Sequence, residues 1–539
     1  MTAVLDFLRR VGPLLRAVDW RSKTTLYWTV AGALVIAFLS QERALGLTYP
    51  MPWPDEALFL WQALAVKDGT TLVAPELNAE RPIFWMPYGY MVLQGLIFKI
   101  TGFSLSWARM LSALYLGGTL LCLAHLASRF ATRFASLALF AAFLSMPIVR
   151  FAGNTARMET LVALIAALGL VLLSQRRMLA GLATLSFAPL VHPNGQFVVF
   201  AGAVYVAGRV LGRRLAPYVK ASAPEVSPSG APRAALFALR NWEWLVAAGA
   251  ALAWLLFLTY FARHSQDFLQ DLTHQLEWKS GEVAESGTAS WRIQRPWYWG
   301  PLLILAMASL PALRFAPAVL PFAALALALT LRSIVTVGWN YEYYTALAYA
   351  CLGVVLVEVT VRALREGFPR ARRLVPIASA GAGLLAVISL FRTGIHAPSL
   401  LHTVRGSTQP VQDHSRASYW SERDRAAVAS YLLSEVKRAR RPLQVAFFPV
   451  GDALLFADLR GSDLSFLHAT RDPPAYADVA VLHVSVWQTD HQRAISIVSV
   501  GSQQEIGLPI DMWQVVSESP GNRWAVFSRA FDKKKKRGS

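Results

Sequence analysis

The stretch "SWARMLSALYLGGTLLCLAHLASRFATR", residues 106–133, decides the class of fold. Residues 106–127 are apolar over a length that suits a membrane-spanning helix, which needs about 20 such residues. Arg129 and Arg133 follow directly. Basic residues next to an apolar span mark the cytoplasmic face of a membrane. The stretch is therefore typical of a span that returns to the cytoplasm.

The composition of the whole chain extends this interpretation. Of the 539 residues, 55% are hydrophobic and 16% charged, and the mean hydropathy is +0.39. Apolar stretches of spanning length recur, so we predict a polytopic α-helical membrane protein. The net charge of +19 comes from basic clusters in short hydrophilic gaps. These clusters favour topology and contact with membrane lipids over nucleic-acid binding.

The basic gaps give a topology of about 11 transmembrane helices. The predicted spans are 25–41, 106–127, 134–150, 160–174, 178–191, 195–210, 242–262, 298–313, 316–331, 343–361 and 375–391. The predicted divisions are a cytoplasmic basic amphipathic N-terminus at 1–24, a membrane domain at 25–391, a C-terminal extracytoplasmic domain at 392–531 and a basic tail at 532–539. Within the membrane domain we expect external loops at 42–105 and 263–297 and a cytoplasmic linker at 212–241.

Residues 83–101, "IFWMPYGYMVLQGLIFKIT", are long enough to span the membrane. A span here would place Arg129 outside and invert every later basic loop. We therefore predict an amphipathic helix that lies in the outer interface.

The C-terminal part has the pattern of a small α/β domain. "SERDRAAVASYLLSEVKRA", from Ser421, begins with a capping-box pattern and continues with helical apolar spacing. Strand-like runs follow at 443–448, 479–484, 512–516 and 523–528. We expect this domain to dock on the membrane domain, either to help bind an acceptor or in a purely structural role.

This topology places polar residues from separate loops on the outer face. Ionisable groups at a membrane boundary are costly unless they are hydrated, paired or functional. On the outer face the topology places Asp55, Glu56, Glu80, Arg81, Asn154, Arg157, Glu159, His192, Asn194, His264, Asp267, Asp271, His274, Glu277, Lys279, Arg292, Arg295, Asn340, Tyr341, Glu342 and Tyr343. The convergence predicts a site at the membrane surface.

Three motifs in this order resemble the GT-C glycosyltransferases, especially the bacterial branch near protein O-mannosyltransferases and lipid A aminoarabinose transferases. The first is "PDEALFLWQALAVKDG", an acidic pair that opens a long external loop. The second is "ERPIFWMPYGYMVLQGLIFKITGFSLSWARMLSALYLGG", with an acidic-basic-proline segment and an Arg at the start of the second span. The third is "GNTARMETLVALIAALGL", whose acidic residue lies at the mouth of a span.

The resemblance implies inverting transfer of a sugar from a polyprenyl-phosphate donor to an extracytoplasmic acceptor: an envelope glycan, a glycolipid or a protein. Asp55 matches the family's catalytic aspartate and would act as general base. Arg81 matches the basic residue of the acidic-basic-proline segment and, with Arg157, would bind the donor phosphate. Residues expected to orient these groups or to contact sugar or acceptor are Glu56, Glu80, Glu159, His264, Tyr341 and Tyr343. The resemblance also implies the inner membrane of a bacterium, with the site on the periplasmic face.

Each assignment has a simpler alternative. Asp55 can cap the helix that begins near Ala57, and Glu56 can be a structural neighbour. Glu80 and Arg81 can form an interfacial ion pair of little energetic value. "HPNG", residues 192–195, has the composition of a tight turn.

A divalent metal is a weaker hypothesis. His264 and His274, with Glu80 or Asp267, offer imidazole and carboxylate ligands. Their spacing matches no specific metal motif, and the sequence requires no cofactor.

Two other classes of function remain open from sequence. The chain can be a transporter or flippase of a lipid-linked precursor, although the polar residues gather at one face rather than at mid-membrane. It can also be a non-catalytic scaffold of an envelope assembly complex.

Overall fold

The computed structural model describes most of the predicted membrane domain and parts of the C-terminal domain. The described ranges are 22–45, 54–69, 72–84, 86–215, 233–286, 317–335, 341–367, 422–448, 450–467, 478–483, 487–490, 494–498, 505–509, 513–518 and 524–529. The predicted spans 298–313 and 375–391 and the basic tail lie outside these ranges.

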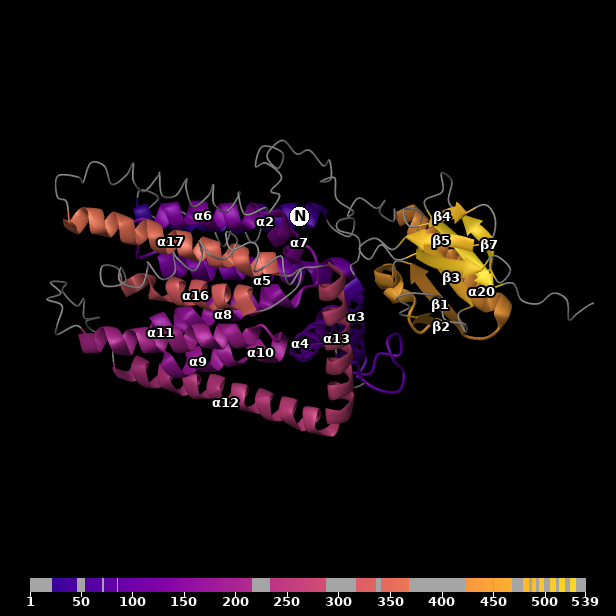
Figure 1. The fold of residues 1–539 in the computed structure, drawn as a ribbon, viewed down its shortest axis with the longest axis horizontal. Coiled ribbons are helices and arrows are strands. Elements are labelled where there is room, and N and C mark those ends of the chain that lie inside the picture. The colour runs from indigo at the N-terminus through magenta and orange to yellow at the C-terminus, as the bar shows by residue number, and fades with distance from the viewer. Residues whose placement is uncertain are drawn as a thin grey trace, which may run out of the picture.

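Four described helices are long and apolar enough to cross a membrane. They are α2 (Lys23–Leu45), α5 (Leu105–Ala127), α12 (Arg233–Arg263) and α17 (Tyr341–Gly367). They lie roughly along a common direction in one bundle (Figure 1). The molecule is thus mostly helical, with apolar helices where the sequence predicts spans.

Shorter apolar helices complete the described bundle. They are α6 (Arg133–Ser145), α8 (Met158–Ser174), α9 (Met178–Ser186) with α10 (Ala188–Val191), α11 (Gly195–Leu215) and α16 (Leu320–Val335). The predicted span 134–150 is interrupted, because α6 ends at Ser145 and α7 (Pro147–Gly153) begins after extended Met146. Proline restricts the preceding residue to extended backbone, which separates the two helices.

Helix α12 shows the surface expected of a lipid-facing helix. It lies along one edge of the bundle (Figure 1), and Leu245, Leu252 and Leu255 are each more than half exposed. An apolar face of this kind is unusual on a protein in water but matches the hydrocarbon core of a bilayer.

The basic residues that suggested a cytoplasmic face meet at one end of the bundle. The buried Glu358 of α17 accepts from the Thr132 hydroxyl (2.7 Å) and from Arg362 Nε (2.6 Å). The guanidinium of Arg133 lies 5.6 Å from the ring of Tyr27 on α2. One end of the bundle therefore gathers Arg133 and Arg362.

Three further described helices, α3 (Pro54–Lys67), α4 (Gly89–Thr101) and α13 (Ser265–Ser286), lie at the other end of the bundle. Helix α3 packs against α4, and α13 runs across the bundle direction beside α3 (Figure 1). At about 1.5 Å per residue the 13-residue α4 is only about 20 Å long, shorter than the hydrocarbon core. Within the segment 263–297, expected to be a loop, Ser265–Ser286 form α13, whose Phe268 packs against Phe84 and Phe261.

The described residues of the C-terminal part form an α-helix, a 3-10 segment and two sheets. Helix α20 (Glu422–Ala439) precedes a sheet with the strand order β2-β1-β3-β8-β7. The strands are β1 (Leu443–Phe448), β2 (Leu464–Leu467), β3 (Val479–His483), β7 (Trp513–Glu518) and β8 (Trp524–Arg529). Strand β1 runs parallel to β2 and β3, and β8 runs antiparallel to β3 and β7.

A second, antiparallel sheet has the order β4-β5-β6. It consists of β4 (Trp487–Asp490), β5 (Ala494–Val498) and β6 (Glu505–Pro509). Strands β1, β3, β7 and β8 lie at the runs that the sequence predicts as strands, whereas β2, β4, β5 and β6 were missed. The 3-10 segment η6 (Val450–Leu459) faces α3.

Candidate active site

The acidic pair of the opening motif divides at the start of α3. Pro54 begins the helix, a position that suits proline because the first N–H of a helix has no intrahelical partner. Glu56 is completely buried. Arg109 of α5 donates to both Glu56 carboxylate oxygens, at 3.0 and 2.8 Å. These contacts favour the structural role for Glu56 over contact with sugar.

Glu56 also connects α3 to the loop before α8. The backbone N–H of Ala156 donates to Glu56 Oε1 at 2.7 Å. In the chain, Asp55 directly precedes Glu56 and Arg157 directly follows Ala156. The side chains of Asp55 and Tyr341 lie outside the described residues.

Arg157 belongs to a group of buried polar residues, which we call the polar cluster: Arg157, Glu159, His192, Arg332, Tyr343 and Tyr344. Arg157 Nε lies 3.8 Å from Glu159 Oε2. Glu159 interacts electrostatically with His192 and Arg332 as well. The cluster joins α8, the turn after α10, α16 and α17.

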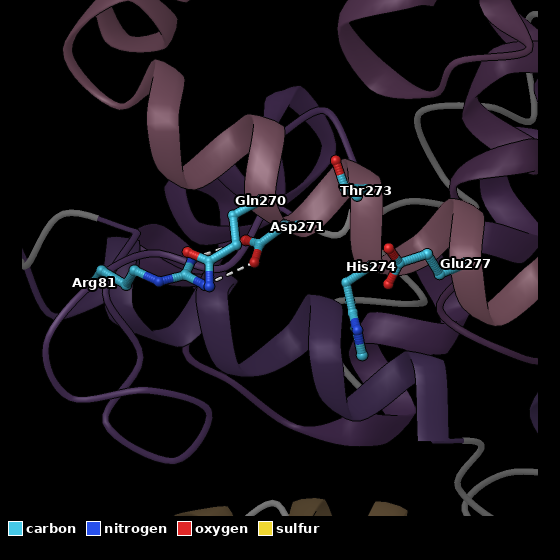
Figure 2. Close-up of a pocket in the computed structure, with 6 residues that line it drawn as sticks. All are labelled: Arg81, Gln270, Asp271, Thr273, His274 and Glu277. Atoms are coloured by element: carbon cyan, nitrogen blue, oxygen red, sulfur yellow. Dashed lines mark hydrogen bonds and ion pairs between the residues drawn. The ribbon is translucent and has the colours of Figure 1, made fainter.

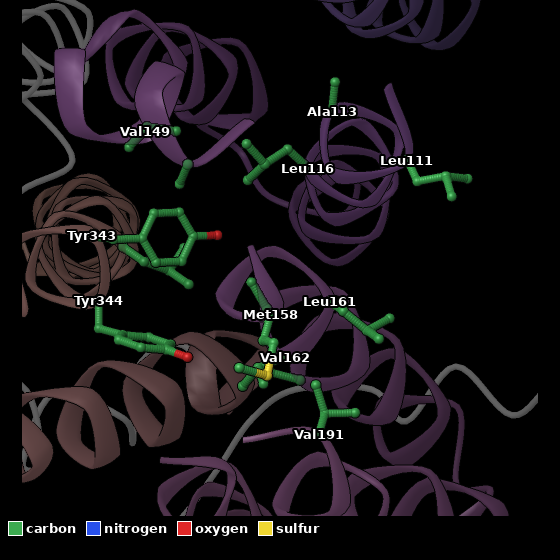
Figure 3. Close-up of a cluster of buried hydrophobic side chains, with 14 of the residues drawn as sticks. Leu111, Ala113, Leu116, Val149, Met158, Leu161, Val162, Val191, Tyr343 and Tyr344 are labelled. Atoms are coloured by element: carbon green, nitrogen blue, oxygen red, sulfur yellow. The ribbon is translucent and has the colours of Figure 1, made fainter. Parts of the chain in front are cut away.

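The aromatic side of the polar cluster comes from the beginning of α17. The Arg332 guanidinium lies 4.5 Å from the centre of the Tyr344 ring, a cation–π distance. Tyr343 packs edge-on against Tyr344, with ring centres 5.3 Å apart. Figure 3 shows both rings directed from α17 toward α8, with the Tyr344 oxygen near Met158 and Val162. The two buried hydroxyls have no hydrogen-bond partner among the described residues.

The turn "HPNG" positions the histidine of this cluster. His192 Nδ1 accepts the N–H of Asn194 at 3.1 Å. A Cβ on Gly195 would lie 2.1 Å from the Ala188 carbonyl carbon. Only glycine permits this close approach, so the turn holds α10 against α11.

Arg81 lies in a second group, against α13 rather than in the polar cluster. Its guanidinium donates to both carboxylate oxygens of Asp271, at 2.9 and 2.7 Å. The same carboxylate accepts the Phe84 N–H at 2.7 Å. The hydrogen bonds that Arg81 donates to Asp271 raise the pKa of Arg81, so the guanidinium remains charged. The carboxylate of Asp267 lies 3.8 Å from Arg81 Nε.

An open pocket of about 560 Å³ borders this second group. Its lining residues are Arg81, Gln270, Asp271, Thr273, His274 and Glu277. Figure 2 shows the Arg81–Asp271 pair at one side of the pocket and His274 with Glu277 at the other. The pocket therefore presents one guanidinium together with several side chains of α13.

The proposed metal ligands do not form a cluster in the part of the chain that the structure describes. Glu80 is exposed, and its backbone N–H donates to the side chain of Asn78 at 2.8 Å. His264 lies 3.3 Å from Asp267 and packs against Tyr260, with ring centres 4.7 Å apart. Among the described residues no three His, Cys, Asp or Glu side chains converge in a way that would hold a metal ion.

Helix α3 connects the two groups. Its first turn is tied to Ala156 through Glu56, and its Gln62 side chain donates to the Ile83 carbonyl oxygen at 2.5 Å. Residues 55 and 62 are seven residues apart, which is about 10 Å along a helix. The helix that carries Asp55 is thus bonded to the residue before Arg157 and to a residue of the segment that contains Arg81.

Two arginines of this region were not among the predicted site residues. Arg332 lies in the otherwise apolar run "LPFAALALALTLRSIV" and is 1% exposed. A lone ionisable residue in such a run was the available signal. Arg109 was noticed as part of a motif, but its partner Glu56 is 53 residues away in sequence, and nothing local indicates that pairing.

The chain is similar to a solved structure of a known protein. No family model and no curated protein matches the chain. The crystal structure of ArnT from Cupriavidus metallidurans bound to undecaprenyl phosphate matches 95% of this chain and 99% of its own, with 13% identity and a TM-score of 0.43.

Proposed function

We propose that the protein is an inverting membrane glycosyltransferase of the GT-C type. It would transfer a sugar from a polyprenyl-phosphate donor to an acceptor hydroxyl. The observation that carries the proposal is the hydrogen bond from the Ala156 N–H to the Glu56 carboxylate, which connects the helix that carries Asp55 to the loop of Arg157. It supports the proposal because the proposed base, Asp55, and the buried Arg157 are the chain neighbours of the two residues that it joins.

In the proposed reaction Asp55 accepts the proton of the acceptor hydroxyl as that oxygen attacks the anomeric carbon. The new bond forms opposite the bond to the phosphate oxygen, which breaks, so the configuration inverts. The electron pair leaves on the polyprenyl phosphate, and the charge that develops there calls for guanidinium groups. Arg157 and Arg81 supply them, with Glu159 and Asp271 as the carboxylates that orient each arginine.

The arrangement of charges supports a site on the periplasmic face of a bacterial inner membrane. The polar cluster meets the first turn of α17, and Glu358 with Arg362 lies at its far end. Tyr344 and Arg362 are 18 residues apart, or about 27 Å along a helix. The predicted cytoplasmic residues and the site are therefore separated by nearly the thickness of the hydrocarbon core.

The test is transfer of a labelled sugar from a synthetic polyprenyl-phosphate donor by the purified protein. We expect Asp55→Asn to reduce the rate by roughly 10²–10⁴-fold, the contribution of a positioned base. Asp458→Asn makes the same chemical change at an exposed carboxylate of the C-terminal part and should retain the wild-type rate. Unchanged transfer by Asp55→Asn would refute the mechanism, and consumption of no donor would favour the transporter or scaffold alternatives.

A further inference from the structure

One arginine of the C-terminal part binds two carboxylates that follow α3. Arg460, just after η6, approaches Asp68 Oδ2 with Nη1 at 2.5 Å. Its Nε lies 2.6 Å from Glu76 Oε1, and its Nη2 donates to Glu76 Oε2 at 3.4 Å. Asp68 directly follows the last residue of α3, and Glu76 lies in the segment that leads to Arg81. Arg460 therefore joins the helix to the segment beyond its turn.

Aromatic packing makes this contact part of a continuous core. Trp61 of α3 stacks on Phe466 of β2, with ring centres 6.0 Å apart. Phe466 packs in turn on Phe447 of β1 at 5.7 Å. All three side chains are at most 2% exposed, and the Arg460 guanidinium lies 5.9 Å from the Trp61 ring. Buried aromatic contacts of this kind make strong anchors at interfaces.

The segment held by Arg460 is ordered by its own hydrogen bonds up to Arg81. The Ala74 carbonyl oxygen accepts the Asn78 N–H at 2.9 Å. The Asn78 side-chain oxygen then accepts the N–H groups of Glu80 (2.8 Å) and Arg81 (3.2 Å). Glu76 lies within this chain of turns, so a displacement of Glu76 is transmitted to Arg81 over only five residues.

We propose that Arg460 is a positioning residue. Through its contacts with Asp68 and Glu76, the C-terminal part fixes the position of Arg81 relative to α3. This inference rests on the proposed function, because Arg81 there binds the donor phosphate. Arg460 touches neither donor nor acceptor in this scheme. It holds residues 72–84 against α3, and thereby keeps Arg81 at a fixed distance from the helix that carries Asp55.

The first test measures the contact without reference to activity. Hydrogen–deuterium exchange of the full-length protein in detergent should show faster exchange in residues 72–84 for Arg460→Ala than for wild type. Arg438→Ala removes an exposed ion pair with Glu435 inside the C-terminal part and should leave exchange in 72–84 unchanged. Unchanged exchange in Arg460→Ala would overturn the proposal.

The second test measures transfer by the same variants. We expect Arg460→Ala to lower kcat between roughly ten- and a hundredfold, the scale of a misplaced catalytic group. The KM for the acceptor should not change, and Arg460→Lys, which keeps the charge, should be intermediate. If Arg460→Ala instead reduced the amount of folded protein, less active enzyme would be present and the rate would fall for all substrates alike. Gel filtration and thermal unfolding measure the amount of folded protein directly.

The two tests separate the inference from the proposed function. Faster exchange with a wild-type kcat would overturn the positioning role. If the wild-type protein transferred no sugar, the proposed function would fail by itself. The exchange result would then still decide whether Arg460 holds residues 72–84.

Discussion

Glu56 and Arg109 form a two-point ion pair in the interior of the protein. The distances from Arg109 Nε and Nη2 to the two carboxylate oxygens are 3.0 and 2.8 Å. The side chains are 0% and 2% exposed. Glu56 thereby links α3 to α5 and, through the Ala156 N–H, to the loop of Arg157. The residue next to the proposed base is thus an anchor for three parts of the fold.

Removing one partner of this pair should strongly destabilise the protein. We expect Glu56→Gln to lower the free energy of unfolding by about 3–5 kcal/mol, because Arg109 would keep a buried charge without its carboxylate. The control, Glu435→Gln, breaks the pair with exposed Arg438 and should cost less than about 1 kcal/mol. Thermal unfolding in detergent compares them, and equal melting temperatures would contradict the anchoring role.

Two glycines provide a matched test of helix packing beside the site. A Cβ on Gly95 of α4 would lie 2.6 Å from the Ala63 carbonyl oxygen of α3, whereas a Cβ on Gly249 of α12 would meet nothing within 4 Å. Gly95→Ala should therefore separate α4 from α3 and destabilise the protein by about 1–3 kcal/mol. Gly249→Ala should be neutral or stabilise by up to about 1 kcal/mol, because alanine favours helix. If Gly95→Ala and Gly249→Ala both lowered the melting temperature, or both raised it, this explanation by packing would be excluded.

The sequence predicts the described spans well because apolar length is a local property. The helices at 105–127 and 158–174 follow directly from it. The site is less predictable because its pairs are distant in sequence: 53 residues separate Glu56 from Arg109, and 190 separate Arg81 from Asp271. No local pattern indicates which of several carboxylates binds a given arginine. Tertiary packing decides that choice.

Arg332 should contribute to transfer although sequence reasoning overlooked it. It lies in the polar cluster, over the Tyr344 ring and close to Glu159. If this cluster faces the leaving phosphate, Arg332→Gln should reduce kcat/KM by roughly 10²-fold, the effect of losing one charged or hydrogen-bonding group in such a site. Arg332→Lys should recover part of the activity. Tyr115→Phe, which alters a tyrosine of α5 outside the cluster, serves as the control.

Steady-state kinetics of these variants distinguishes catalysis from packing. A packing role for Arg332 predicts that Gln and Lys variants lose melting temperature in parallel with activity. A phosphate role predicts that Arg332→Gln loses more activity than Arg332→Lys at equal melting temperature. Equal kcat/KM for Arg332→Gln and Tyr115→Phe would remove Arg332 from the proposed site.

The contribution of Arg460 to stability should depend on pH through Glu76. Burial raises the pKa of Glu76, and Arg460 offsets part of that rise. A carboxyl group with a raised pKa in the folded state favours folding most at low pH, and this contribution falls as pH rises through that pKa. Arg460→Ala removes the offset, so the pKa of Glu76 should rise further. The loss of stability with increasing pH should then be larger in Arg460→Ala than in the wild-type protein.

Melting temperatures of wild type and Arg460→Ala should therefore be closest in acid and diverge as the pH increases toward neutrality. Asp68, the other carboxylate at Arg460, also contacts Lys67. The double variant with Arg460→Ala and Glu76→Gln lacks the titrating carboxyl group. The difference in melting temperature between this double variant and Glu76→Gln alone should therefore be independent of pH. A difference that still grew with pH in the Gln background would assign the effect to a group other than Glu76.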